Sequence, residues 1–137
     1  MTDILCVNET EAQLILGQDE PLENPESIEE AMELLLLKCH TIVVTLGSKG
    51  AALATRDQRK PLWIRIDQVE KVVDTTGAGD SFVGSMAYYL SYYPDLDLAS
   101  IVTRSCAVAS LTVQKEGTQT SFPYRHELPN SQFFQAK

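Results

Sequence analysis

One stretch of nine residues, Asp-Thr-Thr-Gly-Ala-Gly-Asp-Ser-Phe at positions 74–82, carries the residue types best suited to chemistry. It follows a β-branched run at 69–73 and precedes an apolar-periodic segment, so the pattern predicts a strand, a tight turn and a helix start. The unpaired N–H groups of a helix start attract anions such as phosphate. Gly77 and Gly79 lack a Cβ and therefore allow a phosphate close to the main chain. Asp80 could then accept the proton of a hydroxyl that attacks the phosphoryl group.

The same turn also has a purely structural interpretation. Asp is a favoured helix N-cap, and glycine-rich turns join strands to helices in many folds. The turn is not a P-loop, because the Gly-Lys-Ser/Thr ending of that motif is missing. From these residues alone, a cap and a catalytic base both stay open for Asp80.

The first elements of the chain can be placed from their caps and their hydrophobic periodicity. Residues 4–7 form a short apolar run that predicts a buried strand. Asn8 is suited to cap the next helix, with Glu11 at the third helical position completing a capping box and Gly17 ending the helix. A cap of this kind explains both polar side chains without any ligand.

A second helix and a hairpin follow. The Asn-Pro pair at 24–25 predicts a capped helix start, and apolar periodicity extends this helix to about Cys39. Residues 41–46 form the clearest strand, continuous and β-branched, as expected of a central parallel strand covered on both faces. A turn at 47–50 leads back into a strand at 51–55.

Two extended segments, at 62–66 and 69–73, lead from the hairpin to the glycine-rich turn. Apolar periodicity then predicts helices at 79–93 and 98–113. A polar loop containing a glycine follows at 115–121.

The complete nine-residue stretch at 74–82 resembles the C-terminal signature of the ribokinase-type, phosphofructokinase-B-like carbohydrate kinases. The Asn-Glu-Thr-Glu string at 8–11 and the Thr-Leu-Gly-Ser-Lys-Gly turn at 45–50 resemble two further motifs of this family. The resemblance implies an α/β fold with a parallel-rich sheet flanked by helices. Residues 1–137 would form a single domain, the nucleotide-binding C-terminal part of such a kinase.

The resemblance also implies roles for individual residues. Asp80 would be the catalytic base, and the main chain of Gly77, Ala78 and Gly79 would form the anion hole for the transferred phosphate. Cys106 stands where the family usually has Asn or His near the adenine, and a thiol is a weaker hydrogen-bond partner. The full set expected near ATP is Asn8, Glu11, Thr45, Gly47, Ser48, Gly50, Gly79 and Cys106.

Two metal ions are implied in the same way. Glu11 would hold Mg²⁺ through water, and Mg²⁺ would bridge the phosphates of ATP. A K⁺ ion would shape the anion hole from outside, bound mostly by main-chain oxygens. The residues expected around K⁺ are Asp74, Thr76, Thr112, Lys115, Gly117 and Ser121.

The function implied is ATP-dependent phosphorylation of a small sugar, with the 5-hydroxyl of D-ribose as the favoured acceptor. The sugar-binding segment and the β-stranded lid of the family have no counterpart in these residues, so the chain is expected to be part of a longer kinase, whose full-length form would be a homodimer. One alternative is a fragment or short isoform that binds nucleotide without turnover. Another is a kinase for a nucleoside or a different sugar.

Composition limits the remaining classes. The 137 residues carry a net charge of −8, which argues against duplex nucleic acid or an anionic membrane as a partner. The three cysteines are widely spaced and form no Cys-x-x-Cys pair, which argues against a disulfide framework or a zinc site. No signal peptide and no apolar run near ~20 residues is recognisable. The expected location is the cytoplasm, with the nucleus as a second compartment.

Overall fold

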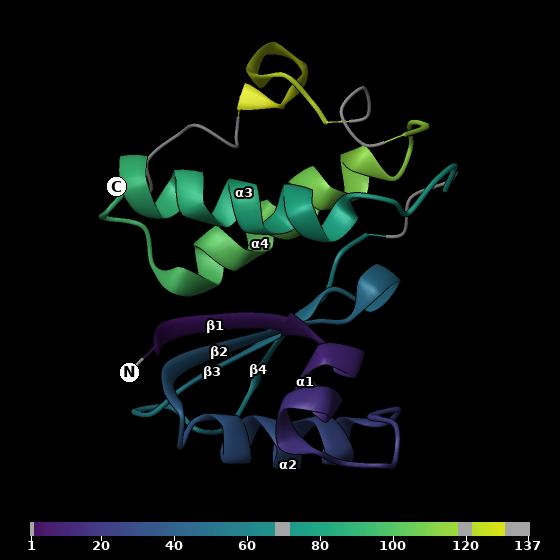
Figure 1. Ribbon diagram of the computed structural model, residues 1–137. Coiled ribbons are helices and arrows are strands. Elements are labelled where there is room, and N and C mark those ends of the chain that lie inside the picture. Colours follow the sequence, from purple (N-terminus) through teal and green to yellow (C-terminus); the bar gives the residue numbers. More distant parts are fainter. Residues whose placement is uncertain (1, 68–71, 118–121, 131–137) are drawn as a thin grey trace. The chain divides into compact units, whose positions relative to one another are not determined.

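A computed structural model describes residues 2–67, 72–117 and 122–130 of the chain. The chain divides into two compact units, Met1–Arg65 and Ile66–Lys137. The described part of the first unit contains β1 (Thr2–Asn8), α1 (Glu9–Leu16), α2 (Pro25–Leu35), β2 (Cys39–Thr45), β3 (Ala51–Thr55) and β4 (Leu62–Ile64) (Figure 1). The second unit contains α3 (Ala78–Tyr92) and α4 (Leu98–Thr112). The single domain expected from the sequence stays a prediction.

The strands of the first unit form one sheet in the order β1-β2-β3-β4. β1 and β2 are parallel, with Thr2 opposite Cys39 and Asn8 opposite Thr45. β2 pairs antiparallel with β3, and β3 pairs antiparallel with β4. A sheet flanked by helices confirms the predicted α/β class. The described sheet is mixed, because the predicted hairpin at 41–55 adds antiparallel pairs beside the parallel one.

Helices α1 and α2 cover one face of this sheet (Figure 1). Met32 and Leu35 of α2 and Ile42 and Val44 of β2 are at most 1 % exposed and belong to one hydrophobic core. Val43 points to the opposite face of the sheet, since side chains alternate along a strand, and it is also buried. The prediction of a central strand at 41–46 is therefore confirmed, but β2 is parallel only to β1 and pairs antiparallel with β3.

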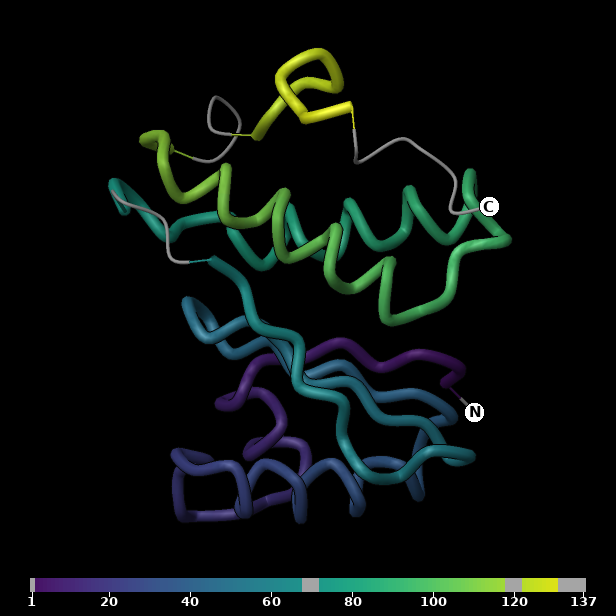
Figure 2. Tube along the Cα trace, turned by 180° about the vertical axis from the view of Figure 1, so that it is seen from behind, coloured from purple at the N-terminus to yellow at the C-terminus, as the bar shows by residue number. Residues whose placement is uncertain are grey.

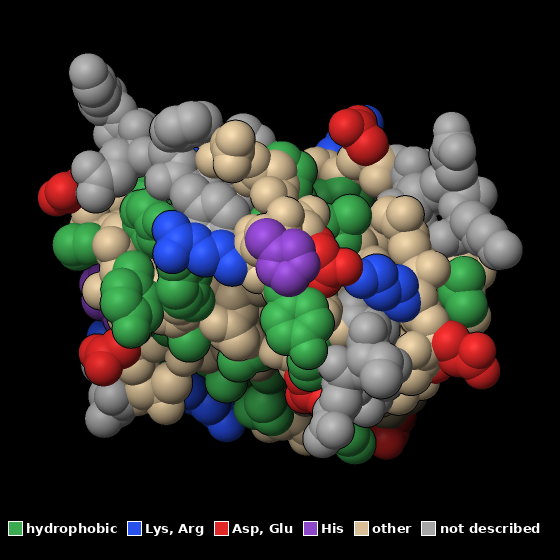
Figure 3. Space-filling view, turned by 90° about the horizontal axis from the view of Figure 1, so that it is seen from above, with side chains coloured by type: hydrophobic (Ala, Val, Ile, Leu, Met, Phe, Trp, Pro, Cys, Tyr) green, Lys and Arg blue, Asp and Glu red, His purple; other side chains and the backbone are tan. Residues whose placement is uncertain are grey.

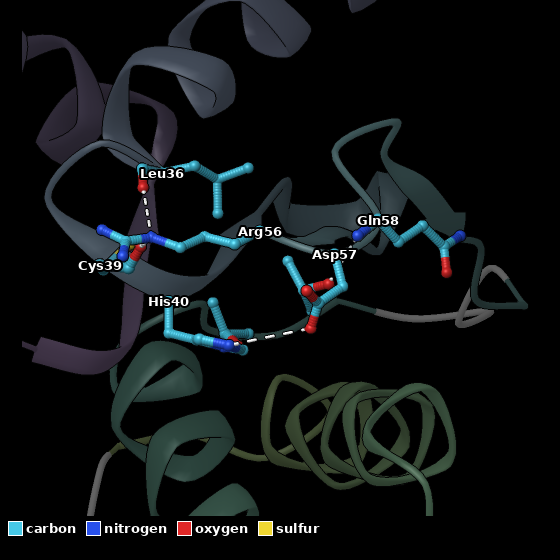
Figure 4. Close-up of polar contacts among 8 residues, drawn as sticks. Leu36, Cys39, His40, Arg56, Asp57 and Gln58 are labelled. Atoms are coloured by element: carbon cyan, nitrogen blue, oxygen red, sulfur yellow. Dashed lines mark hydrogen bonds and ion pairs between the residues drawn. The ribbon is translucent and has the colours of Figure 1, made fainter.

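Helix α2 ends at Leu35, whereas the sequence predicted a helix to about Cys39, and Cys39 instead begins β2. The chain turns over residues 36–38. The guanidinium Nε of Arg56 donates to the carbonyl oxygens of Leu36 and Cys39, both at 3.0 Å (Figure 4). A cationic donor near a helix C-terminus satisfies carbonyl groups that the helix leaves free. The apolar run gave no sign of this end, because the stabilising partner is distant in sequence.

The turn between β2 and β3 depends on Gly50. Its φ is 101°, and a Cβ at this position would overlap the carbonyl oxygen of Ile64 in β4. Only glycine adopts this conformation at such a close approach without strain. β4 ends at Ile64, so the extended segment predicted at 62–66 is shorter than expected.

In the second unit, α3 and α4 pack side by side (Figures 1 and 2). Phe82 and Tyr89 of α3 and Ile101 and Val102 of α4 are at most 3 % exposed. Asp97 caps the start of α4. Both helices confirm the sequence prediction. No helix in the described part of the chain combines the length and apolar character needed to cross a bilayer.

The strand predicted at 69–73 is not found in the described residues. Residues 68–71 lie outside them, and Val72 and Val73 belong to no strand. The N–H of Val73 donates to the carbonyl oxygen of Val113 at 2.8 Å. The chain therefore enters the glycine-rich turn from a segment that is hydrogen-bonded to the end of α4.

Candidate functional site

The glycine-rich turn forms the start of helix α3, as predicted. Gly77 is the N-cap, with φ 82°, and no side chain caps the helix. The N–H of Ser81 donates to the carbonyl oxygen of Gly77 at 2.9 Å, and the N–H of Ala78 donates to that of Thr75 at 3.2 Å. Among the described residues, none accepts from the N–H groups of Gly79 and Asp80. These two groups are therefore among the donors available to an anion.

Asp80 is the third residue of α3 and not its cap. Its side chain is exposed and makes no hydrogen bond or ion pair with any described residue. A carboxylate in the first helical turn is favourable toward the helix dipole. Its oxygens remain available to accept a proton from a molecule that binds beside the turn. The capping alternative left open by the sequence is therefore not what the structure shows.

Gly79 has no structural reason to be glycine. It is absent from the described glycines with positive φ, and a Cβ built on it would meet no atom within 4 Å. Alanine would also favour the helix by up to about 1 kcal/mol. A bound group that approaches the main chain closely would account for glycine at this position.

The residues expected around K⁺ are in part brought together at the end of α4. The Asp74 carboxylate accepts from the N–H of Thr76 at 2.8 Å and from the N–H of Gly117 at 3.1 Å. Hydrogen bonds from the Thr76 side chain and main chain, and then from Gly117, lower the pKa of Asp74. Thr112 is the last residue of α4 and is fully buried. Ser121 lies outside the described residues.

Lys115 has a partner of its own. Its Nζ lies 2.7 Å from a carboxylate oxygen of Glu127, in the short 3₁₀ turn Arg125–Glu127. Its side chain is therefore committed to an ion pair, and only its main-chain oxygen remains for the predicted cation. On the face seen in Figure 3, cationic side chains lie next to acidic and apolar ones.

The first unit brings a second group of predicted residues together. Asn8 caps α1 by accepting from the N–H of Glu11 at 2.8 Å, and Glu11 accepts from the N–H of Asn8 at 2.9 Å. The predicted capping box is therefore confirmed. Thr45 lies opposite Asn8 in the β1–β2 register, and Gly47 and Ser48 follow it in an exposed turn. This edge holds the carboxyl ends of two parallel strands, where α/β folds commonly bind ligands.

Two expected nucleotide contacts have other surroundings. Cys106 is a buried residue of α4 and is 4 % exposed. Gly50 is buried, and its contact with β4 explains it without a nucleotide. Within the described residues, no group of three or more His, Cys, Asp or Glu side chains could hold a metal ion. Mg²⁺ commonly binds through few carboxylates together with substrate phosphates and water, so a large acidic cluster is not required.

A hollow of about 250 Å³ lies elsewhere in the second unit. Tyr88, Tyr89, Val108 and Arg125 are among its lining residues. No residue of the glycine-rich turn lines it. It is therefore separate from the candidate phosphate site.

Two hydrogen bonds that hold the turn in place are not predicted from the sequence, although the family resemblance places Asp74, Thr112 and Gly117 around one K⁺ ion. The Asp74 carboxylate reaches Gly117, and the hydroxyl of Thr112 donates to that of Ser81 at 2.8 Å. Both contacts join residues more than thirty positions apart. Ser and Thr side chains have many local hydrogen-bonding uses, so only the fold reveals that Ser81 and Thr112 are partners.

Comparison with known proteins identifies the family. The model of the pfkB family carbohydrate kinases matches residues 1–125. The chain is 41 % identical to mouse (Mus musculus) ribokinase over 134 residues, which is 97 % of this chain and 41 % of the relative. It is 35 % identical to the deoxyribokinase of Salmonella typhi, over 88 % of this chain and 38 % of the relative.

A solved structure gives the same result. The structure of Arabidopsis thaliana ribokinase complexed with ribose and ATP aligns with a TM-score of 0.83 and 34 % identity. The alignment covers 97 % of this chain and 41 % of that one. The chain therefore spans about 40 % of the length of these relatives. Together, the family match and the aligned fold show that this chain belongs to the pfkB family of carbohydrate kinases.

Proposed function

We propose that this chain supplies the nucleotide-binding part of an ATP-dependent sugar kinase whose acceptor is D-ribose. The observation that carries the proposal is the start of α3, where the exposed Asp80 carboxylate lies beside the unbonded N–H groups of Gly79 and Asp80. These groups combine a phosphate-binding site and a proton acceptor at one helix end. The mouse and plant ribokinases among the relatives favour ribose.

In the proposed reaction, the N–H groups of the turn hold the terminal phosphate of ATP. Asp80 accepts the proton of the 5-hydroxyl as the hydroxyl oxygen forms a bond to the terminal phosphorus. The bond between this phosphorus and the bridging oxygen breaks, and ADP leaves with that oxygen. Catalysis of this kind rests on positioning and on stabilising charge on the transferred phosphoryl group.

Two cations complete the proposal. Glu11 would bind Mg²⁺ through water, because one of its carboxylate oxygens already accepts from Asn8. Main-chain oxygens near Asp74 and Gly117 would surround K⁺, because the Asp74 carboxylate draws these two segments together. Bound cations would neutralise phosphate charge that a chain of net charge −8 otherwise repels.

A second candidate function is nucleotide binding without turnover. It is favoured by the coverage of only about 40 % of the relatives. Measuring Mg·ATP affinity and ribose-dependent ADP release on one preparation of a longer protein that contains this segment separates the two. Binding together with ADP release supports the kinase, binding alone supports the second function, and the absence of both contradicts the proposal.

The acceptor needs its own test, because a deoxyribokinase is among the relatives. ADP release would be compared with D-ribose, 2-deoxy-D-ribose and a nucleoside, in a longer protein that contains this segment. The proposal predicts the highest kcat/KM for D-ribose. A higher value for 2-deoxy-D-ribose or for the nucleoside would replace ribose as the substrate without removing the phosphate site.

A further inference from the structure

One hydrogen bond joins the start of α3 directly to the end of α4. The hydroxyl of Thr112 donates to the hydroxyl oxygen of Ser81 at 2.8 Å. Ser81 is 8 % exposed and Thr112 is fully buried. Ser81 is the residue after Asp80, so the bond lies one position away from the proposed catalytic base.

Other hydroxyl groups on α4 serve their own helix. Thr103, Ser105 and Ser110 each donate to the carbonyl oxygen four residues earlier. Such bonds are a common alternative for Ser and Thr within helices and position nothing outside them. The Thr112 hydroxyl differs because it reaches another helix as well as lying 3.2 Å from the carbonyl oxygen of Val108.

The other side of the turn is fixed to the same end of α4. The carbonyl oxygen of Val113 accepts from the N–H groups of Val73 and Asp74, at 2.8 and 3.2 Å. The Asp74 carboxylate also accepts from Gly117. Residues 75–80 are therefore held between two anchored points.

We propose that Ser81 and Thr112 are positioning residues, whose hydrogen bond sets the direction of the first turn of α3. This direction in turn orients the N–H groups and the carboxylate that face the phosphate. The inference rests on the proposed function. A buried hydroxyl pair suits this role, because leaving either partner unpaired in the interior is costly. The pair thus fixes one geometry of the turn without touching the nucleotide.

Three substitutions test this role. Thr112→Val removes the hydroxyl while keeping the β-branched shape, and Thr112→Ser retains the hydroxyl. Thr103→Val is the matched control, since Thr103 lies on the same helix and its hydroxyl donates to Ala99 of that helix. Ser81→Ala removes the other partner if Thr112→Val does not fold. Circular dichroism would establish that each variant is folded at the temperature used.

The first measurement is the dissociation constant for Mg·ATP. Thr112→Val and Ser81→Ala should each weaken binding by about tenfold, the equivalent of one buried hydrogen bond. The double variant should lose no more than either single one, because both remove the same bond. Thr112→Ser should restore most of the affinity, and Thr103→Val should bind as the wild type does. Unchanged affinity in folded Thr112→Val and Ser81→Ala would overturn the inference.

A second measurement needs no nucleotide. The amide NMR resonances of residues 77–80 should shift in Thr112→Val and Ser81→Ala and stay in place in Thr103→Val. If the wild-type chain binds no Mg·ATP, the proposed function is wrong, and these resonances still decide whether the pair positions the turn. Resonances that remain unshifted in both variants would show that it does not.

Discussion

An aspartate at position 80 could be a helix cap or a catalytic base, and its position in α3 excludes the cap. Gly77 occupies the cap, and Asp80 lies three residues further on with an exposed carboxylate. A capping Asp would accept from N–H groups of its own helix, whereas this carboxylate accepts from no described group. The residue is therefore free to take part in proton transfer.

Asp80→Asn tests that role. In a longer kinase that contains this segment, the substitution should lower kcat for ribose-dependent ADP formation by about a hundredfold or more, as expected when a general base is removed. The amide is nearly the same size, so the affinity for Mg·ATP should change by less than about 1.4 kcal/mol, or tenfold. The kinetics of both forms would be measured side by side. Equal turnover in the Asn variant would remove the assignment of Asp80 as the base.

Asp74 should make the anchoring of the turn depend on pH. Its pKa is lowered from the ordinary value of 3.8, first by hydrogen bonds from Thr76 and then by the one from Gly117. The stabilising contribution of the carboxylate is therefore present above 3.8 and is lost as the pH falls through the lower folded-state pKa. The amide of Gly117 should therefore lose protection over that range, so that its exchange becomes faster relative to the intrinsic rate at each pH.

The control for this prediction is Asp74→Asn, which cannot lose a charge. Its Gly117 amide should exchange faster than that of the wild type at neutral pH and respond less to acidification. Identical pH profiles for the two proteins would contradict the proposed anchoring by Asp74.

At the scale of elements, the sequence predicted where helices begin better than where they end. Side-chain caps such as Asn8 and Asn24 act within three residues, so their signal is local and the structure confirms both helix starts. The end of α2 depends instead on Arg56, which reaches back to the turn after that helix. Nothing in the neighbouring apolar residues records that contact.

The site shows the same division between local and distant information. Family resemblance and turn chemistry predict roles for Gly77, Gly79 and Asp80, which are close in sequence and share one helix start. The contacts that hold this turn, from Thr112 to Ser81 and from Gly117 to Asp74, appear only once α4 packs against α3.

Two glycines should respond to alanine in opposite ways. Gly79→Ala should leave the free energy of unfolding unchanged or raise it by up to about 1 kcal/mol, because the position is helical and open. The added methyl should nevertheless weaken Mg·ATP binding, since it occupies the path to the main chain. Gly50→Ala should lower the free energy of unfolding by about 1–3 kcal/mol, because of its positive φ and its contact with Ile64.

Chemical denaturation and calorimetric titration of both variants would check this contrast. The informative variant is Gly79→Ala, for which we expect an unchanged or higher free energy of unfolding together with a lower affinity for Mg·ATP. Wild-type affinity for Mg·ATP in a fully folded Gly79→Ala protein would show that no phosphate approaches this glycine.

At the scale of the whole molecule, the main feature is the outer edge of strand β1. Among the described strands β1 pairs only with β2, so alternate residues of β1 direct N–H and C=O groups away from the sheet. The chain spans about 40 % of the length of these relatives.

Hydrogen exchange on this chain should show that pattern. Amides of β2, which is paired on both sides, should exchange slowest, and alternate amides of β1 should exchange quickly. In a longer protein that contains the segment, the fast amides of β1 should become protected. Uniformly slow exchange along β1 in the present chain would mean that its outer edge is already covered.

The most direct test of the central claim is an NMR titration of the isotope-labelled chain with Mg·ATP and, separately, with AMP. If the turn holds the terminal phosphate, the amide resonances of Gly79 and Asp80 should shift and saturate with Mg·ATP and move much less with AMP, which lacks that phosphate. Resonances of these two residues that stay in place while other parts of the chain respond to Mg·ATP would contradict the account.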